Sequence, residues 1–377
     1  MKLSILSLIS SDQIGGVETY SIEYARALNS LGNQYRVVCP SDSLRMVFEK
    51  EGVEFVTLPD YRFLETRGSI VLLPNIIKSI VALYKIVSLY GASVLNINAN
   101  STSSLVMSIV ASSIKGLPIV MTVHGVGPFQ YRSYSSLLKI ALRRSSAVIA
   151  ISDEIKDELV AKYGYSEKIY VIPNGINLNK TERPVCKPMT GDPKLVLISR
   201  LDNEKIDAVF KAMGAMSMVH KECERATLDI IGGGVRMDEV SYKANKLNER
   251  VGGPIIRVLG EMTPTMVNEQ ISNSDVVLGA GRVALEGMAL GKPVVFLSSG
   301  GYGGSLSPDN VVALKTSNFS GRSSKPNYSE VDVYNGIIDL MNPSRYSEVL
   351  QLTAQVIEEY NIDLLARRME SIFTEVL

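Results

Sequence analysis

Two cations stand where an anion could bind. Arg200 follows a short apolar stretch that predicts a buried strand over residues 194–199, and Lys205 precedes a helix predicted over 206–218. Cations between the carboxyl end of a strand and a helix N-terminus suit a diphosphate, because helix N-terminal amides also attract anions. They would stabilise the negative charge that builds on a departing nucleoside diphosphate. The alternative interpretation is a pair of solvated surface cations.

Glycine-rich turns follow two other predicted strands of the second half. Residues 232–234 are three consecutive glycines, which would let a ligand approach the backbone closely or would form a tight turn. Residues 279–295 combine a strand end, a glycine turn, a helix, a glycine C-cap and a buried strand. Glu286 lies among small and apolar residues of that helix, so its carboxylate needs partners. Two hydroxyls of a ribose would serve, and a neighbouring cation is the alternative.

Motifs of several other enzyme classes are absent. The sequence has no G-x-x-x-x-G-K-[ST] P-loop and no G-x-S-x-G elbow, and its Gly15-Gly16 turn lacks the G-x-G-x-x-G spacing of a dinucleotide binder. His124 and His220 are the only histidines, too few for a His-rich metal site. No two aspartates stand at i and i+2 to hold a metal on a diphosphate. We therefore expect no metal and no cofactor, with protein cations and backbone amides holding the diphosphate.

The elements that must position these residues alternate between strands and helices, a pattern that implies parallel sheets. Buried strands are predicted at residues 3–10, 36–39, 94–97, 119–123, 147–151, 194–199, 227–231, 255–259, 276–278 and 293–297. A polar, proline-rich stretch near residue 185 divides the series. The expected fold is α/β, with two Rossmann-like doubly wound domains over 1–185 and 186–345 and C-terminal helices over 346–377 that cross back to the first domain.

The charge balance also differs between the two halves. The chain has 377 residues with 39 basic and 39 acidic side chains, yet residues 1–185 carry 19 basic and 15 acidic groups, a balance of +4. The remainder is −4, and no acidic residue occurs in 66–152. Three scattered cysteines and the lack of a signal-peptide pattern favour a cytoplasmic protein. Residues 70–90 are apolar, but Pro74 and two lysines interrupt them, which favours a buried or amphipathic helix over a membrane span.

Seven short segments, in order, resemble motifs of the GT-B glycosyltransferases, specifically the large retaining family 4, also called group 1. The family patterns are G-G-x-E, T-x-H, I-P-N-G-[VI]-D, G-R-L-x-x-x-K, I-x-G-x-G, L-E-A-M-A-x-G-x-P-V and G-G. The matching segments of this chain are residues 15–18, 122–125, 171–177, 199–205, 230–234, 285–294 and 300–301. Each match is short, but their order and spacing across most of the chain are specific.

The resemblance implies two Rossmann-like domains that face a central cleft, and transfer of a sugar with retained configuration and without a metal. His124 would contact the donor sugar, and Arg200 and Lys205 would bind the pyrophosphate, which makes these three the predicted catalytic set. Glu286 would hold the ribose. The other residues predicted to bind the nucleotide sugar are Gly15, Gly16, Asn174, Gly233, Arg282, Gly300 and Gly301.

The chain departs from the family pattern around the sugar pocket. The family has an E-x7-E motif, and counting eight residues back from Glu286 reaches Leu278. Arg282 stands where an apolar residue is common, and it is interpreted either as a phosphate or sugar ligand or as a structural ion-pair partner. Gly303-Gly304 replaces the usual P-E, and Ile206 replaces a glycine after Lys205. These changes leave the identity of the sugar open.

We expect a glycosyltransferase of the hexosyltransferase type that uses a nucleotide sugar, with UDP favoured because it is the commonest base in the family. The alternatives are a degenerate subunit that binds a nucleotide sugar or a partner without turnover, and a nucleotide-sugar 2-epimerase. A lipid-linked or cell-surface glycan is the expected acceptor, and no nucleic acid is expected. The acid-free, basic span 66–152 of the N-terminal domain predicts weak contact with an anionic membrane, at its inner face. Residues 137–144 would form either an interfacial helix or a core helix with a basic face.

Overall fold

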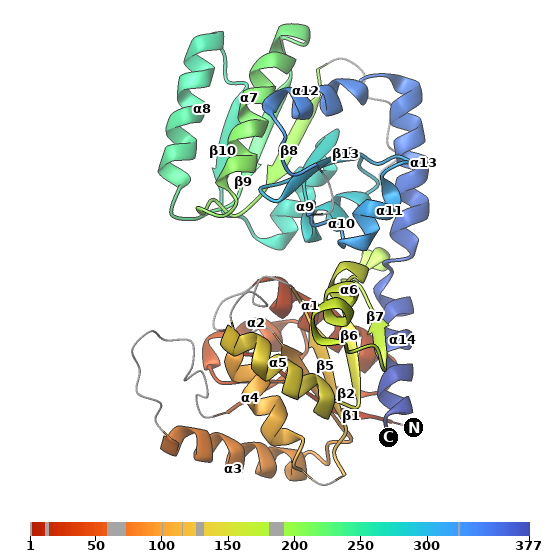
Figure 1. Ribbon diagram of the computed structural model, residues 1–377. Helices are drawn as coiled ribbons and strands as arrows, with labels where there is room; N and C mark the ends of the chain where they lie inside the picture. Colours follow the sequence, from red (N-terminus) through yellow and green to blue (C-terminus); the bar gives the residue numbers. More distant parts are fainter. Residues whose placement is uncertain are drawn as a thin grey trace. The chain divides into compact units, whose positions relative to one another are not determined.

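The chain forms two compact α/β units in the computed structural model (Figure 1). Unit 1 is Met1–Gly175 with Ile362–Leu377, and unit 2 is Ile176–Asn361. The structure describes residues 2–11, 15–58, 73–99, 101–114, 116–125, 132–180, 192–322 and 325–377. Each unit has one sheet with helices on both of its faces, which confirms the predicted α/β fold of two Rossmann-like domains.

Unit 1 is built on a seven-stranded sheet in the order β3-β2-β1-β4-β5-β6-β7, and its paired strands are parallel. The strands are β1 Ser4–Leu8, β2 Gln34–Cys39, β3 Glu54–Thr57, β4 Val94–Ala99, β5 Ile119–Val123, β6 Ala147–Ala150 and β7 Ile169–Val171. The order reverses between β1 and β4, and ligands of such sheets bind where the order reverses, at the carboxyl ends of the strands.

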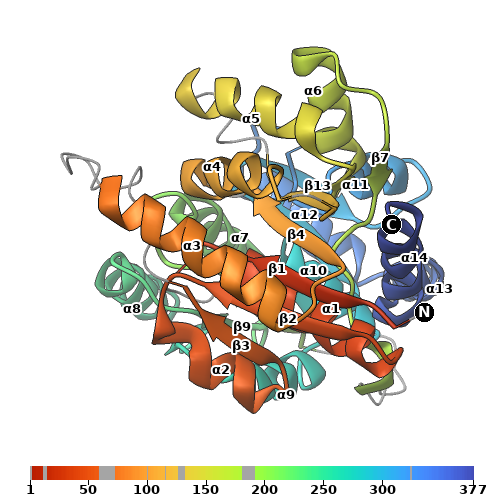
Figure 2. The same cartoon turned by 90° about the horizontal axis from the view of Figure 1, so that it is seen from below.

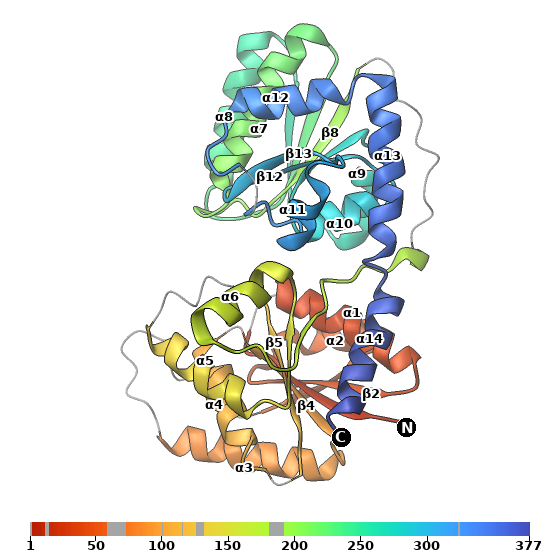
Figure 3. The ribbon, with the colours of Figure 1, turned by 45° about the vertical axis from the view of Figure 1, so that its right-hand side comes forward.

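Helices from both ends of the chain cover the sheet of unit 1. They are α1 Gly16–Ser30, α2 Arg45–Lys50, α3 Leu73–Leu89, α4 Thr102–Ala111, α5 Arg132–Arg144, α6 Asp153–Tyr163 and α14 Ile362–Glu375. The C-terminal helix α14 packs against α1 (Figure 3). Its apolar stripe of Leu365, Met369, Ile372 and Phe373 is buried, which explains why this helix docks on unit 1.

Unit 2 has a six-stranded sheet in the order β10-β9-β8-β11-β12-β13, in which only β13 runs antiparallel to its neighbour. The strands are β8 Lys194–Ile198, β9 Thr227–Ile231, β10 Ile256–Gly260, β11 Val276–Gly279, β12 Val294–Ser298 and β13 Gly301–Ser305. The helices are α7 Ile206–Glu222, α8 Met237–Val251, α9 Pro264–Ser272, α10 Arg282–Ala289, α11 Val311–Thr316, α12 Glu330–Asp339 and α13 Pro343–Glu358. The strand order reverses between β8 and β11.

The unit boundaries differ from the predicted domain boundaries of 185/186 and 345/346. The chain enters unit 2 at Ile176, whose N–H donates to the carbonyl of Tyr360 at 2.8 Å. The predicted segment 346–377 divides into α13, which packs on α10 in unit 2, and α14 in unit 1. The sequence analysis also missed β3, β7 and β13, which are short and carry no alternation of apolar and polar residues strong enough to be recognised.

The apolar segment at 70–90 forms helix α3 from Leu73 onward. Among the helices that the structure describes, none combines the length and the apolar character that crossing a bilayer requires.

Candidate functional site

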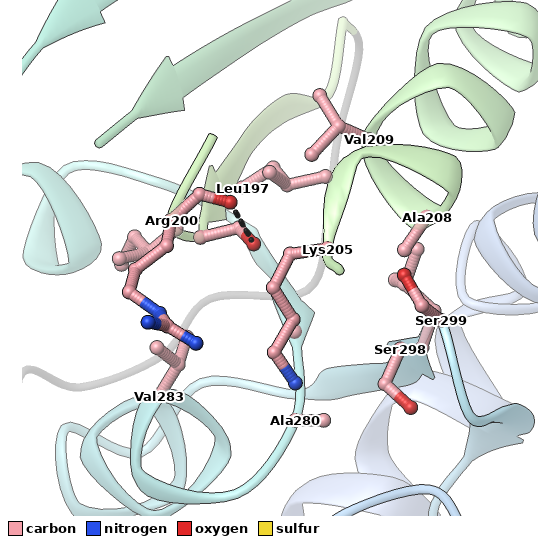
Figure 4. Close-up of a pocket in the computed structure, with 13 residues that line it drawn as sticks. Leu197, Arg200, Lys205, Ala208, Val209, Ala280, Val283, Ser298 and Ser299 are labelled. Carbon is pink, nitrogen blue, oxygen red and sulfur yellow. Dashed lines mark hydrogen bonds between the residues drawn. The ribbon is translucent and has the colours of Figure 1, made fainter. Parts of the chain in front are cut away.

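A cavity of about 180 Å³ lies at the point where the strand order of unit 2 reverses. β8 and β11 end there at Ile198 and Gly279, and the turns that follow these strands form much of the wall. The lining residues, shown in Figure 4, are Leu197, Ile198, Ser199, Arg200, Lys205, Ala208, Val209, Gly279, Ala280, Val283, Leu297, Ser298 and Ser299. The cavity is therefore placed where a doubly wound sheet binds its ligand.

A second cavity, of about 400 Å³, adjoins the first, since Lys205, Ala280, Ser298 and Ser299 line both. The other residues on its wall are Glu204, Gly281, Gly300, Ser320 and Arg322. The sequence analysis missed Arg322 and the three serines, because their approach to Lys205 depends on the packing of loops from distant parts of the chain. The combined space offers three cations, four hydroxyls and one carboxylate to a ligand.

Arg200 and Lys205, both predicted to bind a pyrophosphate, are brought together on the wall of the smaller cavity. The Arg200 side chain is 69% exposed and lies 3.3 Å from Asp202 and 3.6 Å from Glu204. Lys205 is the N-cap residue of α7 and is exposed, and no ion pair of the described residues involves it. In Figure 4 its ammonium group points toward Ala280. Exposed ion pairs contribute little free energy, so a cation at the mouth of a cavity can exchange its protein partner for a bound anion at little cost.

The turn that carries Arg200 is held by Asp202 and the glycine run. Asp202 Oδ1 accepts the backbone N–H groups of Glu204 and Lys205, each at 3.0 Å. The N–H of Leu201 donates to the carbonyl of Gly233 at 2.8 Å. These hydrogen bonds fix the direction in which the turn leaves β8 and so position the Arg200 backbone.

Close backbone packing accounts for two of the three consecutive glycines. A Cβ atom on Gly232 would lie 1.9 Å from the Ser199 carbonyl oxygen, and the φ of Gly232 is +141°. A Cβ on Gly234 would lie 2.4 Å from the Leu201 oxygen. Between them, a Cβ on Gly233 would meet the Glu261 carboxylate at 2.4 Å. The run therefore supports the Arg200 turn, and ligand contact by Gly233 stays a prediction.

Arg282 and Glu286, predicted to contact the nucleotide sugar, form an ion pair with each other. Arg282 Nε lies 2.9 Å from Glu286 Oε1, one turn apart on α10, and both side chains are 25% exposed. Neither residue belongs to the wall of the two cavities. The structure therefore contains the ion pair that the sequence analysis gave as the alternative role of both residues. Their contacts with a ligand stay predictions.

Leu278 occupies the position of the first glutamate of the family's E-x7-E motif, but it is not placed where it could contact a ligand. Leu278 is fully buried in β11, inside the core of unit 2. The turn after β11, with Ala280 and Gly281, takes its place at the cavities. Gly281 has φ +60° and is the N-cap residue of α10, and it has no side chain with which to cap the first amides of the helix.

In unit 1, His124 follows the carboxyl end of β5 and is held by Asn98 of β4. His124 Nε2 lies 2.7 Å from Asn98 Oδ1. Asn98 Nδ2 donates to the carbonyl of Leu8 at 3.1 Å, and a carbonyl can only accept, so the amide oxygen must face the imidazole. His124 Nε2 therefore carries the proton, and the lone pair is on Nδ1.

Burial keeps the His124 ring neutral. It lowers the pKa of His124 to about 3, so the imidazole carries no charge near pH 7. The ring of Tyr20 meets the imidazole edge-on, with centroids 4.8 Å apart. This neutral ring can accept a hydrogen bond from a sugar hydroxyl through Nδ1, and it cannot serve as an acid.

The other predicted residues of unit 1 are placed as follows. Gly15 and Gly16 are exposed at the start of α1, and the Gly15 N–H donates to Glu18 at 2.9 Å, while residues 12–14 of the same loop lie outside the described part. Burial raises the pKa of the Glu18 carboxyl. Asn174 Oδ1 is buried and accepts no hydrogen bond from the residues that the structure describes.

Gly300 and Gly301 have different environments in unit 2. Gly300 is on the wall of the larger cavity, and its N–H donates to Ser298 Oγ at 3.1 Å. Gly301 is buried and begins β13. Of this predicted pair, the structure brings Gly300 to the cavity.

Comparison with known proteins agrees with this arrangement. The family model described as Glycosyltransferase Family 4 matches residues 14–180, and the one described as Glycosyl transferases group 1 matches residues 192–314. A Mycobacterium tuberculosis glycogen synthase is 26% identical over 212 residues, 52% of this chain. The chain spans about half the length of the curated relatives that it matches.

Two solved structures share the fold across essentially the whole chain. A glycosyltransferase from Rickettsia africae has a TM-score of 0.76 at 18% identity and covers 100% of this chain and 98% of its own. Anabaena HepE, solved with UDP and glucose, has a TM-score of 0.71 at 16% identity and covers 99% of each chain. The two matched families, together with the GT-B architecture, show that this chain belongs to the family 4, or group 1, glycosyltransferases.

Proposed function

We propose that the chain transfers a hexosyl group from a UDP-sugar to a lipid-linked or cell-surface glycan, with retained configuration and without a metal. The observation that carries the donor half of this proposal is the cavity pair at the β8–β11 switch point. Lys205 is on the wall of both cavities, and the turn before α10 faces the same space. A diphosphate bound there would meet an ammonium group, a guanidinium group and helix N-terminal amides.

The chemistry asks these groups to stabilise a leaving group. Cleavage of the bond between the sugar C1 and the β-phosphate oxygen leaves the electron pair, and so negative charge, on the diphosphate. Lys205 and Arg200 would stabilise that charge, and each such donor typically contributes about 10²–10³ in kcat. The sugar then bonds to the acceptor oxygen, whose proton passes to the departing diphosphate. His124, neutral and fixed as the Nε2–H form, would orient a sugar hydroxyl through Nδ1.

The choice of UDP and the absence of a metal rest on separate arguments. The Anabaena protein solved with UDP and glucose has the same fold, which supports a UDP-sugar donor. Metal independence is supported by the lack of any Asp-x-Asp in the sequence, since that motif is one way to hold a metal on a diphosphate. Retention is supported by the family resemblance.

The acceptor half rests on charge. Unit 1 contains the acid-free segment 66–152, with eight basic side chains, and this favours an acceptor carrying phosphate or embedded in an anionic membrane. With such an acceptor, the protein would work in the cytoplasm, at the inner face of the membrane.

UDP release from a panel of UDP-sugars, with GDP-mannose as the control for the base, tests the donor assignment. We expect release with one UDP-sugar, stimulated by a polyprenyl-diphosphate-linked sugar acceptor and unchanged by EDTA. UDP binding by calorimetry without release for any donor and acceptor would instead identify a degenerate binding subunit. The anomeric configuration of the product, read by NMR, tests retention, and an inverted product would contradict it.

A further inference from the structure

Helix α3 has one face in the core of unit 1 and an apolar face in solvent. Leu83 is 1% exposed and packs in the core. Ile77, Val81 and Tyr84 are 55%, 47% and 47% exposed, and their i, i+4, i+7 spacing places them in one stripe. A stripe of this size on a surface helix is unusual unless something covers it.

Two lysines stand beside this stripe. Lys78 and Lys85 are exposed and lie seven residues apart, so they project from the same side of the helix. That side is directly next to the apolar stripe. No acidic residue occurs in α3, nor in α4 and α5, which follow it across unit 1 (Figure 2). The exposed face therefore combines apolar side chains with lysines that no ion pair of the described residues involves.

The structure shifts the membrane-contact prediction from α5 to α3. The residues of α5 that would have entered a bilayer, Leu138, Ala141 and Leu142, are fully buried. Among the α5 side chains that the structure describes, Ile140 is the large apolar one that is exposed. Helix α5 can add positive charge to a surface but has little apolar area to insert, because its apolar side already packs in the core.

We propose that the exposed face of α3 docks unit 1 on an anionic lipid bilayer, with the helix lying in the plane of the headgroups. The 17-residue helix is about 25 Å long, enough to lie along a surface. The stripe would bury its apolar side chains at the boundary of the acyl chains while the lysines contact anionic headgroups. A nucleic acid would meet the lysines but not the apolar stripe, and an apolar protein partner would leave the lysines unpaired.

The proposal rests on the lipid-linked acceptor of the proposed function, and flotation with vesicles tests it without donor or acceptor. The probe is a vesicle of equal parts phosphatidylcholine and phosphatidylglycerol, compared with phosphatidylcholine alone, at low salt. We expect wild-type protein to bind only the anionic vesicles. Lys78→Gln with Lys85→Gln should weaken binding about 25-fold, since each lysine near an anionic surface contributes about five-fold. Ile77→Gln with Val81→Gln should abolish binding.

Matched control variants exist on unit 1. Lys139→Gln with Arg143→Gln on α5 removes the same charge, and Met46→Gln with Val47→Gln on α2 removes exposed apolar side chains. All four altered proteins should keep the wild-type far-UV spectrum, because the substituted side chains are exposed. The proposal would be overturned if the wild-type protein did not bind the anionic vesicles. It would also be overturned if the control variants lost as much vesicle binding as the α3 variants. UDP release with a soluble acceptor, measured in the same proteins, reports the enzyme activity separately from docking.

Discussion

Asn98 Oδ1 accepts the Nε2–H of His124 at 2.7 Å, while the nitrogen of the same amide donates to the Leu8 carbonyl. Leu8 thus sets the orientation of Asn98, and Asn98 sets the tautomer of His124. Within the described part of the chain no hydrogen bond involves the other ring nitrogen, Nδ1, which can meet a substrate as an acceptor. A residue of β4 therefore decides which hydrogen bond a residue after β5 can make.

Asn98→Asp should raise the pKa of His124, because a carboxylate beside the ring favours the imidazolium form. Asn98→Ala should allow both neutral tautomers and lower kcat at least about 10-fold, the scale of a lost positioning contact, with little change in KM. Nitrogen-15 NMR of the imidazoles reads tautomer and pKa directly, and the two histidines are assigned with His124→Gln. An unchanged Nε2–H tautomer in Asn98→Ala would contradict the assignment.

The neutral, half-buried His124 should also make the stability of unit 1 depend on pH. Burial lowers its pKa to about 3 in the folded state, against about 6.5 when unfolded. The unfolded state binds the proton more readily, so the contribution is full above pH ~6.5 and is lost as the pH falls toward ~3. This group alone should lower the free energy of unfolding by up to about 1.4 kcal/mol per pH unit. Peptide-resolved hydrogen exchange in urea reports the free energy of unfolding of β4 and β5. This free energy should rise less steeply with pH in His124→Gln than in wild type, and equal slopes would contradict the prediction.

Lys205→Ala should reduce kcat about 10²–10³-fold and weaken UDP binding, because one of the groups proposed to meet the diphosphate is lost. Arg200→Ala should act in the same direction. The matched control is Lys221→Ala, an exposed lysine near the other end of the same helix α7, which should leave both quantities near wild type. Steady-state UDP release and calorimetry make the measurement, and equal effects at Lys205 and Lys221 would remove Lys205 from the site.

Gly232→Ala should disturb the Arg200 turn. Its Cβ would meet the Ser199 oxygen at 1.9 Å, and alanine rarely adopts a φ of +141°. We expect unit 2 to lose about 1–3 kcal/mol of stability and UDP binding to weaken with it. Gly253→Ala is the control, because a Cβ there has nothing within 4 Å and the φ is not positive. Thermal melts and UDP calorimetry compare the two, and a Gly232→Ala protein that binds UDP like wild type would show that the turn tolerates the change.

Glu286→Gln separates the two interpretations of the carboxylate. If Glu286 holds the ribose when the donor binds, the variant should bind UDP more weakly and should lose its preference for UDP over 2′-deoxy-UDP. If the ion pair with Arg282 is its only role, binding should be unchanged and stability should fall by about 0.3–0.5 kcal/mol, the usual size of such a helix pair. Calorimetry with the two nucleotides decides between these results.

Local patterns in the sequence were sufficient for the alternation of strands and helices and for the turns at Arg200, Gly232 and Gly281. Apolar periodicity and glycine positions depend on near neighbours, so they can be recognised without the fold. The same holds for the family motifs, which are contiguous. Sequence could also suggest the Arg282–Glu286 pair, because residues four apart share a helix face.

Only the tertiary structure decided which side chains share a space. It brought Lys205 to the same cavity as Ser298 and Arg322, buried Leu278 in the core, and separated α13 from α14. It also set the His124 tautomer, through an amide in a different strand, and left the apolar stripe of α3 exposed while burying that of α5. These outcomes depend on packing between segments that are distant in the chain, and no local pattern of residue types encodes which neighbour a side chain will meet.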